Sequence, residues 1–342
     1  MTTDAGLHTV MLMRELALSA GYAGILRAAA ELRLADALGE APATVTELAL
    51  EVDADPEALA RLLRALACHG VFAEDGQGRY THTETSRLLR ADAPRSMLYM
   101  VLWATEPWTW AVWGRLADAV RLGGEVFTDV HGKDFFTHLH EDAPESAQVF
   151  DRAMTQSSVM SARMVAELLD LSGAGVVADI AGGQGYLLAT LLERHPDLRG
   201  VLFDLPNVLL NPDPRLAEGG ALAGRARLVP GDLRESVTPG ADVYVLKNIL
   251  ELEDESTVRA LRNVRAAARP GARVVVIENL VDGSPEMKFA TAMDLLLLLN
   301  VGGRRHTKDG LIGLIGQAGL RVTGVRPVGP YLHMIESSVP HW

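Results

Sequence analysis

The chain has 342 residues, of which 48% are hydrophobic, and it carries a formal net charge of -12 at pH 7. This length is enough for roughly two domains with full cores, and the acidic balance argues against a nucleic-acid partner, since such binding rests on clustered Lys and Arg. A single cysteine, Cys68, excludes an internal disulfide and favours a reducing compartment. The N-terminus lacks the basic start of a secretory signal, and the apolar stretch around 295–299 is far short of the ~20 residues of a membrane span. We therefore expect a soluble cytoplasmic protein with no membrane partner.

The first part of the chain, residues 1–165, shows apolar residues at helical spacing and no alternation of strands with helices. Thr44, with Glu47 three residues later, is a capping-box signature. Asp55-Pro56 predicts the start of a further helix, with proline in its first turn. The stretch 71–80 places a glycine turn between two short runs and predicts a β-hairpin. Helices followed by a hairpin are typical of a winged helix.

Residues 97–165 are expected to be helical and are rich in aromatic side chains. These side chains pack in a core or dimer interface, or some of them line a pocket for an aromatic substrate, and Trp103 is the candidate substrate contact. The aromatic residues are Trp103, Trp108, Trp110, Trp113, Phe127, Phe135 and Phe136.

From residue 176 onward, apolar strands alternate with helical patterns. Strands are predicted at 176–180, 200–204, 226–230, 242–247, 272–278, 321–327 and 331–336. The alternation predicts a parallel sheet with helices on both faces. Val328-Gly329-Pro330 is too short for a crossover helix, so the last two strands should form an antiparallel hairpin. We expect a Rossmann-like α/β domain over 166–342 after a mainly helical, winged-helix-like domain over 1–165.

A loop of small residues follows the first strand of this sheet. It reads Asp179-Ile-Ala-Gly-Gly-Gln-Gly185, and the second strand ends at Asp204. Glycines here let backbone N–H groups approach an adenosine-containing cofactor, and the acid after the second strand can accept both ribose hydroxyls. The spacing D-x-x-G-G-x-G, together with Asp204 and the terminal hairpin, favours S-adenosylmethionine (SAM) over a nicotinamide cofactor.

With these features, the chain resembles the plant-type small-molecule O-methyltransferases and their bacterial natural-product relatives. The similarity runs through nearly the whole chain and includes Phe150-Asp-Arg-Ala-Met154, Gly231-Asp232, Lys247-Asn-Ile-Leu250, 269–278 and Gly302-Gly303. It implies a winged-helix dimerisation domain, a SAM-binding domain and a homodimer. It also implies methylation of a phenolic hydroxyl on a small aromatic secondary metabolite.

The resemblance also implies roles for individual residues. Asp204 should hold the ribose and Asp232 the adenine amino group, with Leu233 against the ring. Ala181 stands where the family usually has glycine, and its methyl is expected to crowd the methionine carboxylate slightly. The expected cofactor contacts are Asp179, Ala181, Gly182, Gly183, Gly185, Asp204, Leu205, Asp232, Leu233, Lys247 and Ser158. The expected substrate contacts are Met154, Met293, Asn300 and Trp103.

The catalytic positions depart from the family pattern. The family has a histidine base where this chain has Glu251, and its two flanking glutamates correspond to Glu278 and Arg305. In one reading, Glu251 is the base and its ion pair with Arg305 lowers its basicity. In a second, Arg305 binds a substrate carboxylate in bidentate fashion, so the substrate is a hydroxybenzoate-like acid. In a third, the protein binds SAM but catalyses hydroxylation or decarboxylation, as some bacterial relatives do.

Further alternatives stay open at this point. Other candidates for the base are His306, His131, His138 and His140. The acidic run from Glu251 also suits the start of a helix, where negative charge is stabilised by the helix dipole. A winged-helix transcription regulator is a competing class, although acids at 51–57 would repel DNA phosphates. A SAM-sensing scaffold is another, and no metal site is expected.

Overall fold

The computed structural model describes residues 4–238, 240–281, 287–329 and 331–341. By its internal contacts, the chain forms two compact units, Met1–Thr109 and Trp110–Trp342. The domain boundary expected at residue 165, where strand–helix alternation begins, stays a prediction. Within the described residues, no helix is both long and apolar enough to cross a bilayer.

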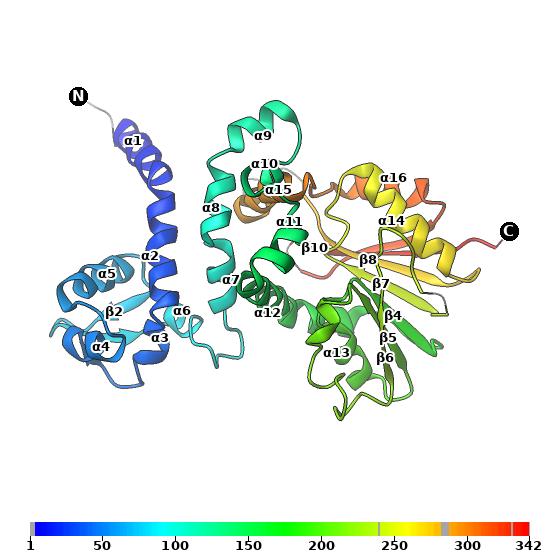
Figure 1. Ribbon diagram of the computed structural model, residues 1–342, viewed down its shortest axis with the longest axis horizontal. Coiled ribbons are helices and arrows are strands. Elements are labelled where there is room, and N and C mark those ends of the chain that lie inside the picture. Colours follow the sequence, from blue (N-terminus) through cyan, green and yellow to red (C-terminus); the bar gives the residue numbers. More distant parts are fainter. Residues whose placement is uncertain (1–3, 239, 282–286, 330, 342) are drawn as a thin grey trace. The chain divides into compact units, whose positions relative to one another are not determined.

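The N-terminal unit combines short helices with one small antiparallel sheet of order β1-β3-β2 (Figure 1). Its helices are α1 (Asp4–Ala17), α2 (Ser19–Glu31), α3 (Leu34–Ala37), α4 (Val45–Glu51), α5 (Pro56–Cys68), α6 (Glu84–Arg87) and α7 (Leu98–Ala104). Its strands are β1 (Ala43–Thr44), β2 (Phe72–Glu74) and β3 (Arg79–His82). The expected hairpin is thereby confirmed.

Local capping explains where two of these helices begin. The Thr44 side chain accepts the N–H of Glu47, and the Glu47 carboxylate accepts the N–H of Thr44 at 2.7 Å, which confirms the capping box at α4. The Asp55 side chain caps α5 by accepting the N–H of Ala58, with Pro56 in the first turn. Helix α1, by contrast, leaves apolar side chains in water: Met13 is 66% exposed and Leu16 61%.

The C-terminal unit is built on a seven-stranded sheet of order β6-β5-β4-β7-β8-β10-β9 (Figure 1). Its strands are β4 (Val176–Ile180), β5 (Arg199–Asp204), β6 (Ala226–Pro230), β7 (Val243–Lys247), β8 (Arg273–Asn279), β9 (Arg321–Pro327) and β10 (Leu332–Ser338). The first five are parallel, whereas β10 runs antiparallel to both β8 and β9. The predicted Rossmann-like sheet and its terminal hairpin are confirmed.

Helices cover both faces of this sheet. These helices are α12 (Pro144–Leu168), α13 (Tyr186–Arg194), α14 (Asp254–Ala267) and α16 (Lys308–Gln317). The unit also contains α9 (Leu116–Leu122), α10 (Phe127–His131), α11 (Phe135–Thr137) and α15 (Lys288–Val301). Helix α8 (Pro107–Trp113) spans the boundary between the units, and the short turns η1 (His138–Asp142) and η2 (Val208–Leu210) follow α11 and β5.

Alternate residues of the buried strands divide the core into two layers. Ile180 and Leu246 pack with α14 and α16 on one face, whereas Val177 and Val245 pack with α12 and α13 on the other. This period of two is the strand pattern itself. With both faces covered, ligand-binding groups are confined to the carboxyl edge of the sheet, as in other open α/β folds.

Candidate active site

The glycine loop follows β4 at this carboxyl edge, where β5 and β7 also end. Close packing requires glycine at two of its positions. A Cβ atom on Gly182 would lie 2.5 Å from Cγ of Asp179, and one on Gly185 would lie 2.6 Å from Cδ1 of Leu216. Gly185 also has φ +86°, which L side chains rarely adopt. The two glycines therefore let the loop pack directly against Asp179 and Leu216.

Ala181, where a glycine was expected, adopts the left-handed conformation with φ +52°. Its N–H donates to the carbonyl oxygen of Phe203 at 2.7 Å, which ties the loop to β5. A non-glycine residue in this region costs on the order of 1 kcal/mol or more. From the sequence, we expected only that the Ala181 methyl would crowd the cofactor. The positive φ of Ala181 adds a second effect, because it destabilises the protein even without a ligand.

We expect Ala181→Gly to stabilise the protein by about 1 kcal/mol, because glycine adopts a positive φ without strain. Thermal unfolding should show a rise in melting temperature of about 2–4 °C. Ala268→Gly is the matched control, since Ala268 has φ -88° and gains nothing from glycine. A lower melting temperature for Ala181→Gly would contradict this account.

Asp204 at the end of β5 is held by the backbone around it. Its Oδ2 accepts the N–H of Gly183 and its Oδ1 accepts the N–H of Leu205, both at 2.7 Å. Burial nevertheless raises the pKa of this carboxyl to about 6, although the two N–H groups oppose the shift. Each oxygen keeps a further lone pair, so the carboxylate can accept two hydroxyl groups.

One face of α12 crosses the carboxyl edge of the sheet. Thr155 Oγ1 donates to Oε1 of Gln184 in the glycine loop at 2.7 Å, and Lys247 Nζ at the end of β7 donates to Ser158 Oγ at 3.1 Å. The predicted substrate contact Met154 is half-buried one turn before Ser158. The sequence analysis missed Thr155, although its spacing from Ser158 is a signal that it shares this helix face.

The end of β7 places a buried cation among acids. Burial lowers the pKa of the Lys247 ammonium. The carboxylates that oppose this shift are Asp179, Glu278 and Glu251. In turn, burial raises the pKa of Asp179 to about 7, and Lys247 opposes that shift. Among the described residues, no group of three or more His, Cys, Asp or Glu side chains is arranged to hold a metal ion.

Asp232 follows β6 and forms an ion pair with Arg234, two residues further along the chain. Arg234 Nη2 lies 2.7 Å from Oδ2 of Asp232, and hydrogen bonds from Arg234 lower the pKa of the Asp232 carboxyl. Leu233 is half-buried and packs against the core, and its carbonyl oxygen accepts Asn263 Nδ2 at 2.8 Å. Both predicted adenine contacts therefore have fixed positions.

The turn that carries Glu251 is held from several directions. Oε1 of Glu278 accepts the N–H groups of Ile249 and Leu250 at 2.9 and 2.8 Å. His306 Nε2 lies 3.0 Å from the carbonyl oxygen of Leu250. Through these two hydrogen bonds, Glu278 fixes the position of the turn that carries Glu251. His306, one of the alternative bases, is buried against the same turn, and burial lowers its pKa.

Gly303 brings the following loop into contact with this turn. A Cβ atom on Gly303 would collide with the backbone carbonyl oxygen of Glu251. Gly302 precedes it with φ +65° and ends α15. The two glycines therefore let the loop that carries Arg305 pack directly on the turn that carries Glu251.

Glu251 and Arg305 form the expected pair, with Arg305 Nε 3.3 Å from Glu251 Oε1. Their side chains are 17% and 6% exposed. The two atoms are not aligned as a hydrogen bond, and the pair is therefore held by charge rather than by a directed bond. Asp294 of α15, which the sequence analysis missed, accepts the N–H of Arg305 at 2.6 Å. Its signal was its place beside Met293 on the predicted pocket helix.

We expected the pKa of Glu251 to be lowered, and this expectation is wrong because the pKa is raised. Arg305 does lower the pKa of Glu251, but burial raises it by more, and Asp294 adds to the rise. Removing a carboxylate from water penalises its charged form. Glu251 is therefore a stronger base than an ordinary glutamate.

The remaining predicted substrate contacts lie on two helices. Met293 is half-buried and Asn300 buried on α15, and Oδ1 of Asn300 has no hydrogen-bond partner among the described residues. Trp103 belongs to α7 of the N-terminal unit, and its contact with substrate stays a prediction. Of the other candidate bases, His131 and His138 pack on Phe127, with ring centroids 4.4 and 5.5 Å from it. His140 is half-buried nearby in η1.

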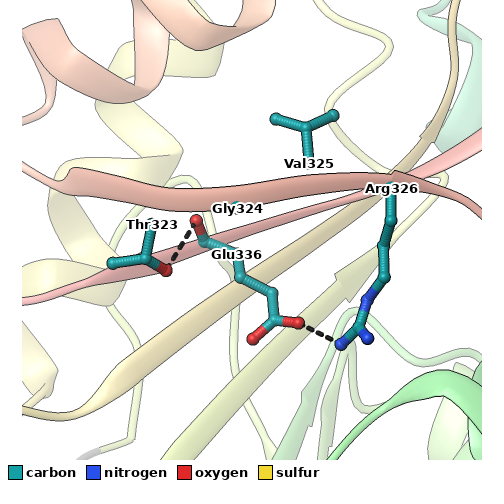
Figure 2. A pocket seen from close by; sticks show the side chains of 5 residues that line it. All are labelled: Thr323, Gly324, Val325, Arg326 and Glu336. Atoms are coloured by element: carbon teal, nitrogen blue, oxygen red, sulfur yellow. Dashed lines mark hydrogen bonds and ion pairs between the residues drawn. The ribbon is translucent and has the colours of Figure 1, made fainter.

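Two hollows are found on the surface of the described residues. One, of about 280 Å³, is formed by β9 and β10, where Arg326 pairs with Glu336 (Figure 2). Its lining contains none of the predicted site residues. The other, of about 440 Å³, includes Asp294, Gly303 and Arg304 in its lining. Neither Glu251 nor Arg305 is among its lining residues.

Comparisons with known proteins agree with this geometry. A family model for the O-methyltransferase domain matches residues 113–321, and one for the O-methyltransferase dimerisation domain matches 15–92. The mitomycin biosynthesis 6-O-methyltransferase of Streptomyces lavendulae is 36% identical over 306 residues, which are 89% of this chain and 87% of that protein.

Solved structures give the same result. The structure of a mitomycin 7-O-methyltransferase has a TM-score of 0.91 at 35% identity and covers 98% of this chain and 99% of its own. An O-methyltransferase from neocarzinostatin biosynthesis, in complex with SAM and 2-hydroxy-5-methyl naphthoic acid, has a TM-score of 0.79 at 32% identity. The match covers 93% of this chain and 96% of that one.

Proposed function

The chain belongs to the O-methyltransferase family of bacterial secondary metabolism, whose members use SAM, and we propose that it methylates a phenolic hydroxyl of an aromatic natural product, with Glu251 as the base. The observation that supports this assignment is the buried Glu251 carboxylate, whose pKa burial raises although Arg305 lies beside it.

The residues at the carboxyl edge suit the cofactor. A Cβ at Gly183 would meet no atom within 4 Å, so the loop leaves open space there for a closely approaching ligand, and the two free lone pairs of Asp204 match the two hydroxyls of a ribose. We assign Asp232 and Leu233 to the adenine, and Lys247 with Ser158 to the methionyl end. When bound, SAM supplies a methyl group activated by its positively charged sulfur.

Glu251 has the chemistry that a phenol requires of the protein. A phenol has a pKa of ~10, so its oxygen is a poor nucleophile near neutral pH unless a base removes the proton. A glutamate of raised pKa accepts that proton more readily than an ordinary one. Since the difference in pKa remains unfavourable, the rest of the rate acceleration comes from alignment of the acceptor oxygen with the methyl group.

Alignment is the role we assign to the groups around Glu251. Glu278 and His306 fix the backbone of its turn, Gly303 fixes the distance to the next loop, and Asp294 fixes the backbone of Arg305. Met154, Met293 and Asn300 are our candidates for contacts to the aromatic ring. None of these groups needs to transfer a proton.

A second candidate substrate class is an aromatic acid of the hydroxybenzoate type. The terminal amino groups of Arg305 make no hydrogen bond to a described residue, although its side chain is only 6% exposed. The buried Nε donor of Arg305 has no hydrogen-bond partner among the described residues, which is costly, and a guanidinium binds a carboxylate in bidentate fashion. The naphthoic acid in one related structure is such a molecule.

Arg305→Met separates the two classes. If Arg305 binds a substrate carboxylate, kcat/KM for hydroxybenzoic acids falls about 10-fold or more, while neutral phenols lose much less. Equal losses for both would remove the acid class. In either case Glu251 loses its counter-ion, so its pKa rises further and the acid limb of the pH–rate profile moves to higher pH. Arg304→Met, which alters an exposed pair with Asp254, is the matched control.

We also propose that the active species is a homodimer. The family's dimerisation domain matches residues 15–92, and the apolar side chains that α1 exposes suit burial against a second chain. Sedimentation at micromolar concentration should then give twice the chain mass of 36.8 kDa. A monomer at that concentration would contradict the assignment.

The proposed reaction is tested by incubation with methyl-labelled SAM and a panel of neutral phenols, hydroxybenzoic acids and aromatic amines. Label in an aryl methyl ether is the expected result. Label only on nitrogen, or no label on any aromatic compound while SAM still binds, would overturn the assignment.

A further inference from the structure

Asp151 of α12 is a titratable group at the cofactor edge to which the proposed mechanism gives no role. Its side chain is partly buried, and its carboxylate makes no hydrogen bond or ion pair with a residue that the structure describes. Burial and the nearby carboxylate of Asp204 raise its pKa to about 6. A carboxylate that is partly withdrawn from water and near a like charge is stabilised by a ligand that donates a hydrogen bond to it.

The helix places Asp151 on the face that crosses the carboxyl edge of the sheet. Residues four and seven positions apart share one side of an α-helix. Thr155, four residues on, contacts the glycine loop, and Ser158, seven residues on, contacts Lys247. Asp151 therefore belongs to the same row of side chains, at its N-terminal end.

Position along this row indicates which part of the cofactor Asp151 meets. Ser158, which contacts Lys247 and which we assign with it to the methionyl end, lies about 10 Å further along the helix axis. Thr155, one turn after Asp151, contacts Gln184, and the neighbouring Gly183 donates its N–H to Asp204, the predicted ribose ligand. The carboxylate of Asp204 also acts on Asp151 electrostatically. Asp151 thus lies at the nucleoside end of the site.

We propose that Asp151 is a cofactor-binding residue that accepts a hydrogen bond from the ribose of SAM on the α12 side, while Asp204 binds the ribose from the sheet. Both oxygens of Asp204 already accept a backbone N–H, so a second carboxylate gives the two ribose hydroxyls an additional acceptor. The inference rests on SAM being the cofactor and is independent of which group is methylated.

Calorimetric titration with SAM, S-adenosylhomocysteine and methylthioadenosine tests the proposal, because all three ligands share the ribose and only SAM and S-adenosylhomocysteine carry the amino-acid end. Asp151→Ala should weaken all three by about 10-fold, since a hydrogen bond to a charged group is lost. Asp151→Asn, which keeps an acceptor oxygen, should lose less. Glu167→Ala, at an exposed site on the same helix, should bind all three like the unaltered protein.

Thermal unfolding of the ligand-free variants separates binding from folding. Removal of Asp151 relieves its repulsion with Asp204, so the melting temperature of Asp151→Ala should be unchanged or higher. Unchanged affinity for all three ligands would overturn the proposal. So would a loss confined to SAM, which would assign Asp151 to the sulfonium, or a lower melting temperature accompanying the loss, which would indicate a structural role.

Discussion

Replacing Glu251 by glutamine lowers kcat by at least about 100-fold, the range expected when a general base is removed. Glutamine keeps the size of the side chain but cannot take the phenol proton. The affinity for SAM should be unchanged, because the cofactor is assigned to the glycine loop, Asp204 and Asp232. Steady-state kinetics and a separate SAM titration measure the two effects.

The pH dependence gives the same prediction an independent readout. Because burial raises the pKa of Glu251 above 4.5, activity of the unaltered protein should fall on acidification at a pH above that ordinary value. Glu251→Gln should lack this acid limb. Glu255→Gln, an exposed acid four residues away, is the control. A turnover within about threefold of the unaltered protein, far from the loss expected for a general base, would show that Glu251 is not the base.

Gly303→Ala has the second largest expected effect. The new Cβ collides with the Glu251 carbonyl oxygen, so the turn and the Arg305 loop must move apart. A displacement of about 1 Å at a catalytic group costs on the order of 100-fold in rate, and overpacking costs about 1–3 kcal/mol of stability. We expect a large loss of kcat, a lower melting temperature and unchanged affinity for SAM.

Gly313→Ala is the matched control for this prediction. A Cβ at Gly313 meets no atom within 4 Å, and alanine favours the helix α16 in which it lies. That variant should keep full activity and the same or a higher melting temperature. Full activity in Gly303→Ala would mean that the spacing between the turn and the loop does not limit catalysis.

The fold followed from the sequence because its signals were local. Strand β4 occupies the predicted range 176–180, since a parallel strand buried on both faces is a continuous apolar run ended by the loop. The capping box at Thr44 and the short link before β10 had equally local causes. The cofactor followed from the same glycine loop.

The environment of the base did not follow from the sequence. Arg305 lowers the pKa of Glu251 as expected, but burial raises that pKa by more. Which of the two effects is larger depends on side chains from several elements, and no local sequence pattern indicates it. For the same reason, Asp294 and the contact of His306 with Leu250 were missed. The sequence identified the unusual residue at the histidine position, but the pKa of that residue depends on the packed site.

A crystal structure with S-adenosylhomocysteine and an accepted aromatic substrate tests the central claim most directly. If Glu251 is the base, the acceptor oxygen should lie within about 2.6–3.2 Å of a Glu251 carboxylate oxygen, on the side facing the sulfur of the cofactor. An acceptor oxygen held by other groups, with Glu251 beyond the reach of one bridging water, would contradict the claim.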